Sequence, residues 1–162
     1  MSDRRVLVLD AEGEIGRWLR AMTDARDRTL ELVDGLSDGD LDRGDPNTIS
    51  SVLYHLAAIE ADWLYDEILG ALEEIPEDLF PYDVREEGGV LTRVTGMSLG
   101  EHLDRLSTVR SAFVEHVSAL DEPAFHRPRS CPNYDVSPAY VLHHLLQHEA
   151  EHRSEIARAR RS

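Results

Sequence analysis

The sequence predicts an all-α protein, a four-helix bundle with a long crossover between the second and third helices. Three observations support this fold class. Apolar residues recur at helical spacing in four segments, and no convincing alternation of strand type occurs between them. The longest connections are punctuated by proline and glycine. The chain has 162 residues, so residues 1–162 are expected to form a single domain with a core of ordinary size.

The first helix is expected from about Ala11 to Gly35. Its inward positions are Ile15, Leu19, Met22, Leu30 and Val33. Gly35 stands where a glycine commonly ends a helix. The stretch Asp38–Asp42 resembles the start of an EF-hand loop, but Arg43 occupies the glycine position and Ile49 the final glutamate position. We therefore interpret this stretch as a solvated turn.

The second helix is expected to begin near Thr48 and to fade between Gly70 and Pro76. Its inward positions are Ile49, Val52, His55, Leu56, Ile59, Trp63 and Ile68. A connection of about 20 residues follows, from Pro76 to Met97, which is long for a compact domain. We expect it to be a crossover or a loop that lines a site.

The last two helices have clear start signals. Ser98 and Glu101 form the capping-box pattern, which predicts a third helix from Ser98 to about Leu120. A loop with Pro123, Pro128 and Pro132 follows. Ser137 and Pro138 then supply a cap residue and a proline for the first turn of a fourth helix, expected to reach the C-terminus.

Three histidines interrupt the apolar faces of these helices. At about 100° per residue, Val141, Leu145, His148, His152 and Ile156 fall within a sector of roughly 80°. His55 lies on the apolar face of the second helix. Burying an imidazole without a partner costs about 1 to 3 kcal/mol, so each ring needs a hydrogen bond or a metal. Three rings that can meet favour a divalent metal, and core histidines satisfied by hydrogen bonds are the alternative.

The stretch from His148 to His152 also matches the H-E-x-x-H metalloprotease signature, in which the glutamate is the general base. The ten residues after His152 contain no His, Asp or Cys, so a third ligand is expected upstream, with His55 as the best candidate. Glu149 lies about 100° from His148 and off the apolar face, which disfavours it as a base. His144 is expected beside the site or on the surface.

The remaining candidates receive structural interpretations. His143 projects to the opposite face of the last helix, and partial exposure is expected for His102, His116 and His126. Trp18 and Trp63 are expected to be core aromatics, and Trp63 could wall the pocket. Cys131 is the only cysteine in the sequence, so an internal disulfide is excluded. Its neighbours Ser130 and Pro132 suggest an ordinary loop residue.

Charge and hydropathy exclude several partners. The net charge is −15, from 32 acidic and 17 basic residues, so a nucleic-acid backbone would be repelled. No apolar run approaches the roughly 20 residues of a membrane span, and the default expectation is a cytoplasmic protein.

Three neutral imidazoles would leave the metal an open position for water or a substrate thiol. Imidazole suits several metals, of which we favour zinc or nickel.

Two motifs resemble the DinB-like (DinB/YfiT-like) superfamily. They are the segment from Asp34-Gly35-Leu36-Ser37 through His55-Leu56-Ala57 to Glu60 and Trp63, and the terminal His148-x-x-x-His152-Arg153 with Ile156. The resemblance implies a four-helix bundle with a long crossover, often a homodimer. It implies a divalent metal bound by His55, His148 and His152. The family commonly has Gly-Gln where this chain has Ser154 and Glu155.

The resemblance also implies a function. The superfamily includes transferases and isomerases that use mycothiol, bacillithiol or glutathione. We therefore expect a metal-dependent enzyme that activates a low-molecular-weight thiol towards a small-molecule substrate. All 17 basic residues are Arg, which is typical of a G+C-rich genome and makes mycothiol the first thiol to test. The alternatives are a metal-dependent hydrolase and a non-catalytic, metal-binding stress-response dimer. The residues do not assign a substrate, a general base or a dimer interface.

Overall fold

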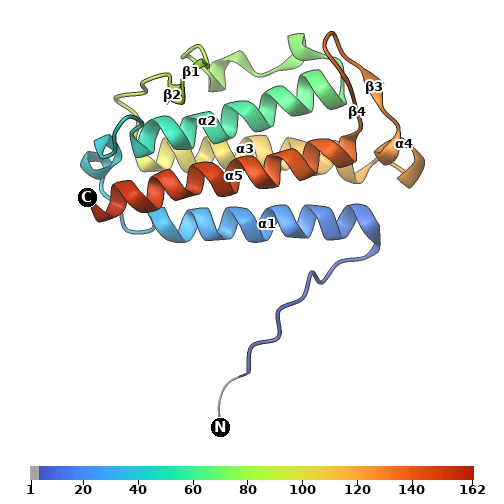
Figure 1. Cartoon of the computed structure of the whole chain (residues 1–162), viewed down its shortest axis with the longest axis horizontal. Helices are drawn as coiled ribbons and strands as arrows, with labels where there is room; N and C mark the ends of the chain where they lie inside the picture. The colour runs from blue at the N-terminus through green and yellow to red at the C-terminus, as the bar shows by residue number, and fades with distance from the viewer. Residues whose placement is uncertain (1–3) are drawn as a thin grey trace.

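The computed structural model describes residues 4–162 and shows four long helices packed side by side (Figure 1). These helices are α1 (Gly13–Val33), α2 (Ile49–Asp62), α3 (Leu99–Ser118) and α5 (Pro138–Arg161). The main helix contacts join α1 to α5, α2 to α3 and α2 to α5. The predicted all-α fold is confirmed, with the long crossover lying between α2 and α3.

The ends of the long helices follow their local signals. The capping box at Ser98 is formed, with the Ser98 hydroxyl accepting from the Glu101 amide and Glu101 accepting from the Ser98 amide. The Ser137 hydroxyl likewise accepts from the Tyr140 amide at the start of α5. Gly35, just past the end of α1, has a φ of 76°, a left-handed conformation that favours glycine. These helix boundaries are therefore encoded by residues within one turn of them.

The acidic stretch after α1 is a short 3₁₀ helix, η1 (Asp38–Asp42), rather than a fully solvated turn. Its first turn is closed by a capping box between Ser37 and Asp40. Leu41 is buried in the core beside α2. The expectation of a solvated turn was thus wrong at Leu41, whose side chain anchors the connection.

The central helix α2 is buried on nearly every side, which the single apolar face in the sequence did not indicate. Its amino end is capped by the Thr48 hydroxyl, which accepts from the Ser51 amide. At its carboxyl end the helix continues as a π-helical turn, η2 (Trp63–Ile68). The outer face of α2 is covered by the crossover: the Tyr54 hydroxyl donates to the carbonyl of Tyr82.

The crossover contains short elements that helical periodicity could not predict. Two 3₁₀ turns, η3 (Leu72–Glu74) and η4 (Glu77–Leu79), precede a hairpin of β1 (Glu86–Glu87) and β2 (Val90–Leu91). Figure 1 shows this hairpin above α2. The proline-rich loop contains α4 (Glu122–His126) and a second hairpin of β3 (Arg129–Ser130) and β4 (Asp135–Val136). Each strand has only two residues, too few to show an alternating pattern.

Hydropathy sets one further limit on the fold. Across residues 4–162, none of the helices combines the length and the apolar character that crossing a membrane requires.

Candidate metal centre

The three predicted ligands converge between α2 and α5. His55 comes from the second turn of α2, and His148 and His152 lie one turn apart on α5. The Nε2 atoms of His55 and His148 are 3.0 Å apart. The ring of His152 completes a triangle, 4.7 Å from the His55 ring and 4.5 Å from the His148 ring between centroids. Each residue offers one ring nitrogen within 4.8 Å of the others, the arrangement that a single metal ion requires.

Burial keeps the rings of His55 and His148 in the neutral form that a metal needs. Burial, and to a smaller extent the nearby His152 ring, lowers the pKa of His55 to about 4. Burial and the neighbouring histidines lower the pKa of His148 to about 3. Both rings are therefore neutral at neutral pH, with nitrogen lone pairs available for coordination.

The orientation of His152 is fixed by a carboxylate that the sequence analysis did not assign to the site. The Nδ1 of His152 lies 2.8 Å from Oε1 of Glu155, three residues further along α5. An imidazole that donates from Nδ1 to a carboxylate presents a basic Nε2 to a metal. The i, i+3 spacing was the available signal. By contrast, Nδ1 of His55 is buried without a hydrogen-bond partner among residues 4–162, so no hydrogen bond at that atom orients the ring.

Glu149 points away from the histidines and into a buried ion network. Its Oε1 accepts from Nε of Arg26 at 2.8 Å and from the Thr29 hydroxyl at 2.9 Å. Arg26 also donates to Glu60, which in turn pairs with Arg110. Burial alone would raise the pKa of Glu60, but Arg110 and Arg26 outweigh it and lower this pKa. Glu149 is thus engaged as an ion partner, away from the position of a general base.

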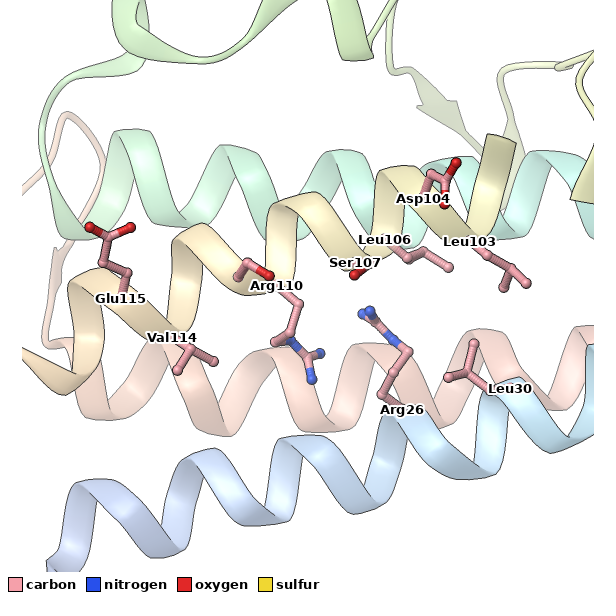
Figure 2. Close-up of a pocket in the computed structure, with 10 residues that line it drawn as sticks. Arg26, Leu30, Leu103, Asp104, Leu106, Ser107, Arg110, Val114 and Glu115 are labelled. Atoms are coloured by element: carbon pink, nitrogen blue, oxygen red, sulfur yellow. The ribbon is translucent and has the colours of Figure 1, made fainter. Parts of the chain in front are cut away.

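The same network faces a groove of about 740 Å³ between α1 and α3. Figure 2 shows Arg26 rising from α1 and Arg110 descending from α3 into this groove, with Leu30 and Leu103 towards one end. The carboxylates of Glu60 and Glu149 lie on the other side of the two arginines, around a small void next to His148. A charged layer of two arginines and two glutamates therefore separates the groove from the histidines.

Aromatic stacking extends the histidine cluster along α5. His144 stacks on Trp63, with 4.2 Å between ring centroids, and its ring centroid is 6.0 Å from that of His148, with 27° between the two ring planes. The rings of Trp63 and Tyr134 are stacked in turn, with 6.4 Å between their centroids, and both line a cavity of about 370 Å³. His144 therefore lies beside the site, and Trp63 and Tyr134 form an aromatic wall leading away from it.

A buried histidine outside the cluster corrects one prediction from the sequence. His102, which was expected to be partly exposed, is 1% exposed, with Nε2 2.7 Å from the Ser50 hydroxyl. Arg105 can only donate, so its contact at 3.2 Å makes Nδ1 of His102 the acceptor and leaves the ring proton on Nε2. That proton points at Ser50, so His102 does not take a proton from the serine as a catalytic base must. The pair is therefore a hydrogen-bonded support between α2 and α3.

Cys131 is not an activated thiol. Its Sγ lies 3.0 Å from the Glu67 carboxylate, to which it donates. This hydrogen bond, with burial, raises the pKa of Cys131. The result agrees with the prediction of an ordinary loop cysteine, since reactive cysteines have lowered pKa values.

The fold and the site together define a class: helical bundles in which three histidines from the second and last long helices lie close enough together to hold one metal ion. The family model of the DinB superfamily matches residues 21–156, which include all three histidines. The chain belongs to the DinB superfamily. The comparison with curated proteins gives no match.

Proposed function

We propose that this protein is a metal-dependent enzyme that activates a low-molecular-weight thiol for transfer or isomerisation. The observation that carries the proposal is the convergence of His55, His148 and His152 on one position. Three neutral imidazoles bind a divalent ion, zinc or nickel in our proposal, and leave at least one position open for a substrate. Such an ion would act as a Lewis acid and lower the pKa of a thiol bound to it.

The surrounding residues support a thiol more than hydrolysis of the metalloprotease type. In that hydrolysis a glutamate next to the first histidine deprotonates a water molecule. Here Glu149 is 5% exposed, and its carboxylate binds Arg26 and Thr29 on the side away from the histidines, so it is not placed to take a proton from that water. A thiol that binds a metal directly loses its proton without such a base. Mycothiol, bacillithiol and glutathione are the cosubstrates to compare. Mycothiol is tested first, because all 17 basic residues are arginine, a composition typical of a G+C-rich genome.

The first test is the metal content of the full, untagged chain by elemental mass spectrometry. We expect about one zinc or nickel ion per chain in the wild type, and loss of that ion in His148→Ala. His143→Ala is the matched control, because His143 is exposed and is five residues before His148 on the same helix. Wild-type protein that stays metal-free after loading with zinc and with nickel would remove the basis of the proposal.

The second test separates thiol chemistry from the other two functions. Metal-loaded and metal-stripped protein is assayed with each thiol and a panel of electrophiles. Turnover that requires both metal and thiol supports the proposal, and thiol-independent turnover of esters or amides would instead indicate a hydrolase. If His55→Ala lowers stability and no turnover is found in any assay, the metal-binding stress-response protein is the better description.

Two parts of the proposal concern the protein in its surroundings. We propose a homodimer in the cytoplasm, as the family resemblance and the soluble composition suggest. Light scattering coupled to size-exclusion chromatography measures the mass directly: a dimer gives twice the 18.3 kDa of one chain. A mass of one chain at micromolar concentration would contradict the dimer without affecting the metal site.

A further inference from the structure

The β1–β2 hairpin of the crossover is shaped by a two-glycine turn. Glu86 pairs with Leu91 and Glu87 with Val90, and Gly88 and Gly89 form the connection. The two glycines have φ values of 58° and 82°. Positive φ at both central residues is the requirement of the tight turns that match the twist of paired strands, and glycine meets it without strain.

The side chain of Asn47 holds this hairpin against the bundle. Its Oδ1 accepts from the Leu91 amide at 2.8 Å, and its Nδ2 donates to the Gly89 carbonyl at 2.9 Å. Nδ2 also donates to Oε2 of Glu155 at 2.8 Å. The other oxygen of Glu155 is the partner of His152. One amide therefore connects the hairpin to the residue that orients a metal ligand.

This anchoring places the carboxylate of Glu86 at the histidine cluster. Oε2 of Glu86 lies 3.9 Å from Nε2 of His55, and the Glu86 side chain is 50% exposed. Successive side chains of a strand point to opposite faces, so Glu87 is directed away from the site that Glu86 faces. Among the described residues, the ion-pair contacts of the three histidines are those with Glu86 and Glu155. Of these two carboxylates, only Glu86 faces an Nε2 atom.

We propose that Glu86 is the fourth ligand of the metal centre. This inference rests on the proposed function, because it requires the ion at the three histidines. Ligands held at about 2.1 Å in a tetrahedron are roughly 3.4 Å apart. The Nε2 atoms of His55 and His148 are 3.0 Å apart, and Glu86 is 3.9 Å from the first of them. A movement of about half an ångström brings the oxygen of this half-exposed side chain to the tetrahedral distance from His55. Glu86 lies outside the group of ligand atoms within 4.8 Å of one another, so its side chain must also turn towards the other two histidines when the ion binds.

A fourth ligand of this kind changes the chemistry of the site. Three imidazoles leave a divalent ion its full charge, whereas one added carboxylate reduces the net charge of the centre to about +1. Glu86 occupies the open position until a substrate thiol replaces it. Its exposure and its place on a two-residue strand allow that replacement, in contrast to the three histidines on long helices.

The test uses Co²⁺ bound to the full chain, with the visible spectrum and the dissociation constant as readouts. The variant is Glu86→Gln, and Glu87→Gln is the matched control, because it removes the same charge one residue away on the opposite face. We expect Glu86→Gln to shift the visible bands and to weaken binding at least tenfold. Glu87→Gln should leave both unchanged. Thermal unfolding of the metal-free proteins checks that both variants are folded.

The outcomes separate the two proposals. Wild type and Glu86→Gln with the same spectrum and the same dissociation constant would overturn the role of Glu86 and leave the three-histidine centre intact. An equal loss in Glu87→Gln would also overturn it, since the effect would then come from the general negative charge. Wild type that binds no Co²⁺ at all would overturn both the proposed function and this inference.

Discussion

The Nδ1 atom of His152 and the Oε1 atom of Glu155 lie 2.8 Å apart on successive turns of α5. This contact decides which ring nitrogen of His152 is free. It also gives a physical role to Glu155, which the sequence alone did not assign to the site. The first prediction concerns this residue.

Replacing Glu155 should weaken metal binding, and the loss should be larger when the new side chain cannot accept a hydrogen bond from His152. We expect Glu155→Ala to lower the affinity for Zn²⁺ about 10- to 100-fold, as is typical for the loss of a partner that orients a metal-binding histidine. Glu155→Gln should cost less, because its amide oxygen still accepts from Nδ1. Competition with a fluorescent chelator measures both. Equal affinity for wild type and Glu155→Ala would show that packing alone orients His152.

Glu149 should be essential for stability and dispensable for the metal. Removing one member of a buried ion network leaves its partner unpaired, and we expect Glu149→Ala to lower the free energy of unfolding by about 3 to 5 kcal/mol. The exposed Glu151→Ala should change it by less than about 0.5 kcal/mol. Urea unfolding gives these values, and metal content is measured on the folded protein. Folded Glu149→Ala that has lost its metal would restore Glu149 as a residue of the site.

The stability of the metal-free protein should fall in mild acid, partly because of His102. Burial, and then the charge of Arg105, lowers the pKa of His102 to about 4 in the folded chain, from an ordinary value of 6.5. The unfolded chain therefore binds the proton first as the pH falls. The stability from neutral His102 is fully present above pH 6.5 and is lost between pH 6.5 and 4.

Comparison with a variant isolates this contribution. Between pH 7 and pH 5, His102→Gln should lose about 2 kcal/mol less unfolding free energy than the wild type, since each pKa unit corresponds to about 1.4 kcal/mol. The exposed His116→Gln should behave like the wild type. Urea unfolding at the two pH values measures the difference. Parallel losses in wild type and His102→Gln would contradict a lowered pKa at His102.

Asn47→Ala should release the β1–β2 hairpin without unfolding the bundle. The variant removes the acceptor of the Leu91 amide and the donor to Gly89. We expect the hydrogen exchange of that amide to increase at least tenfold, with exchange in α1 and α3 unchanged. Asn133→Ala, in an exposed loop, is the control. Unchanged protection at Leu91 would mean that burial of its side chain is sufficient to hold the strand.

The sequence predicted those features that depend on nearby residues. The starts of α3 and α5 follow from Ser98 and Ser137, because a cap acts within one turn. The placement of His55, His148 and His152 follows from helical periodicity, which assigns a side chain to a face. The structure brings the three rings together, while their role as metal ligands stays a prediction.

The features that were missed depend on contacts between distant segments. His102 is buried by its partner Ser50, which is 52 residues away and on another helix. Glu86 reaches the histidines only because Asn47 holds a two-residue strand in place. No local pattern records such a contact, so neither periodicity nor capping could have found it.

The three histidines come from helices that are far apart in the chain, and His55 and His148 are separated by 93 positions. An ion bound there would link the two helices, and only the folded chain brings all three histidines together to bind it. By mass action, free metal at 100 times its dissociation constant would add about 2.7 kcal/mol to the free energy of unfolding. The melting temperature of this protein would then depend on the metal supply around it, which would make its folded fraction a reporter of that supply.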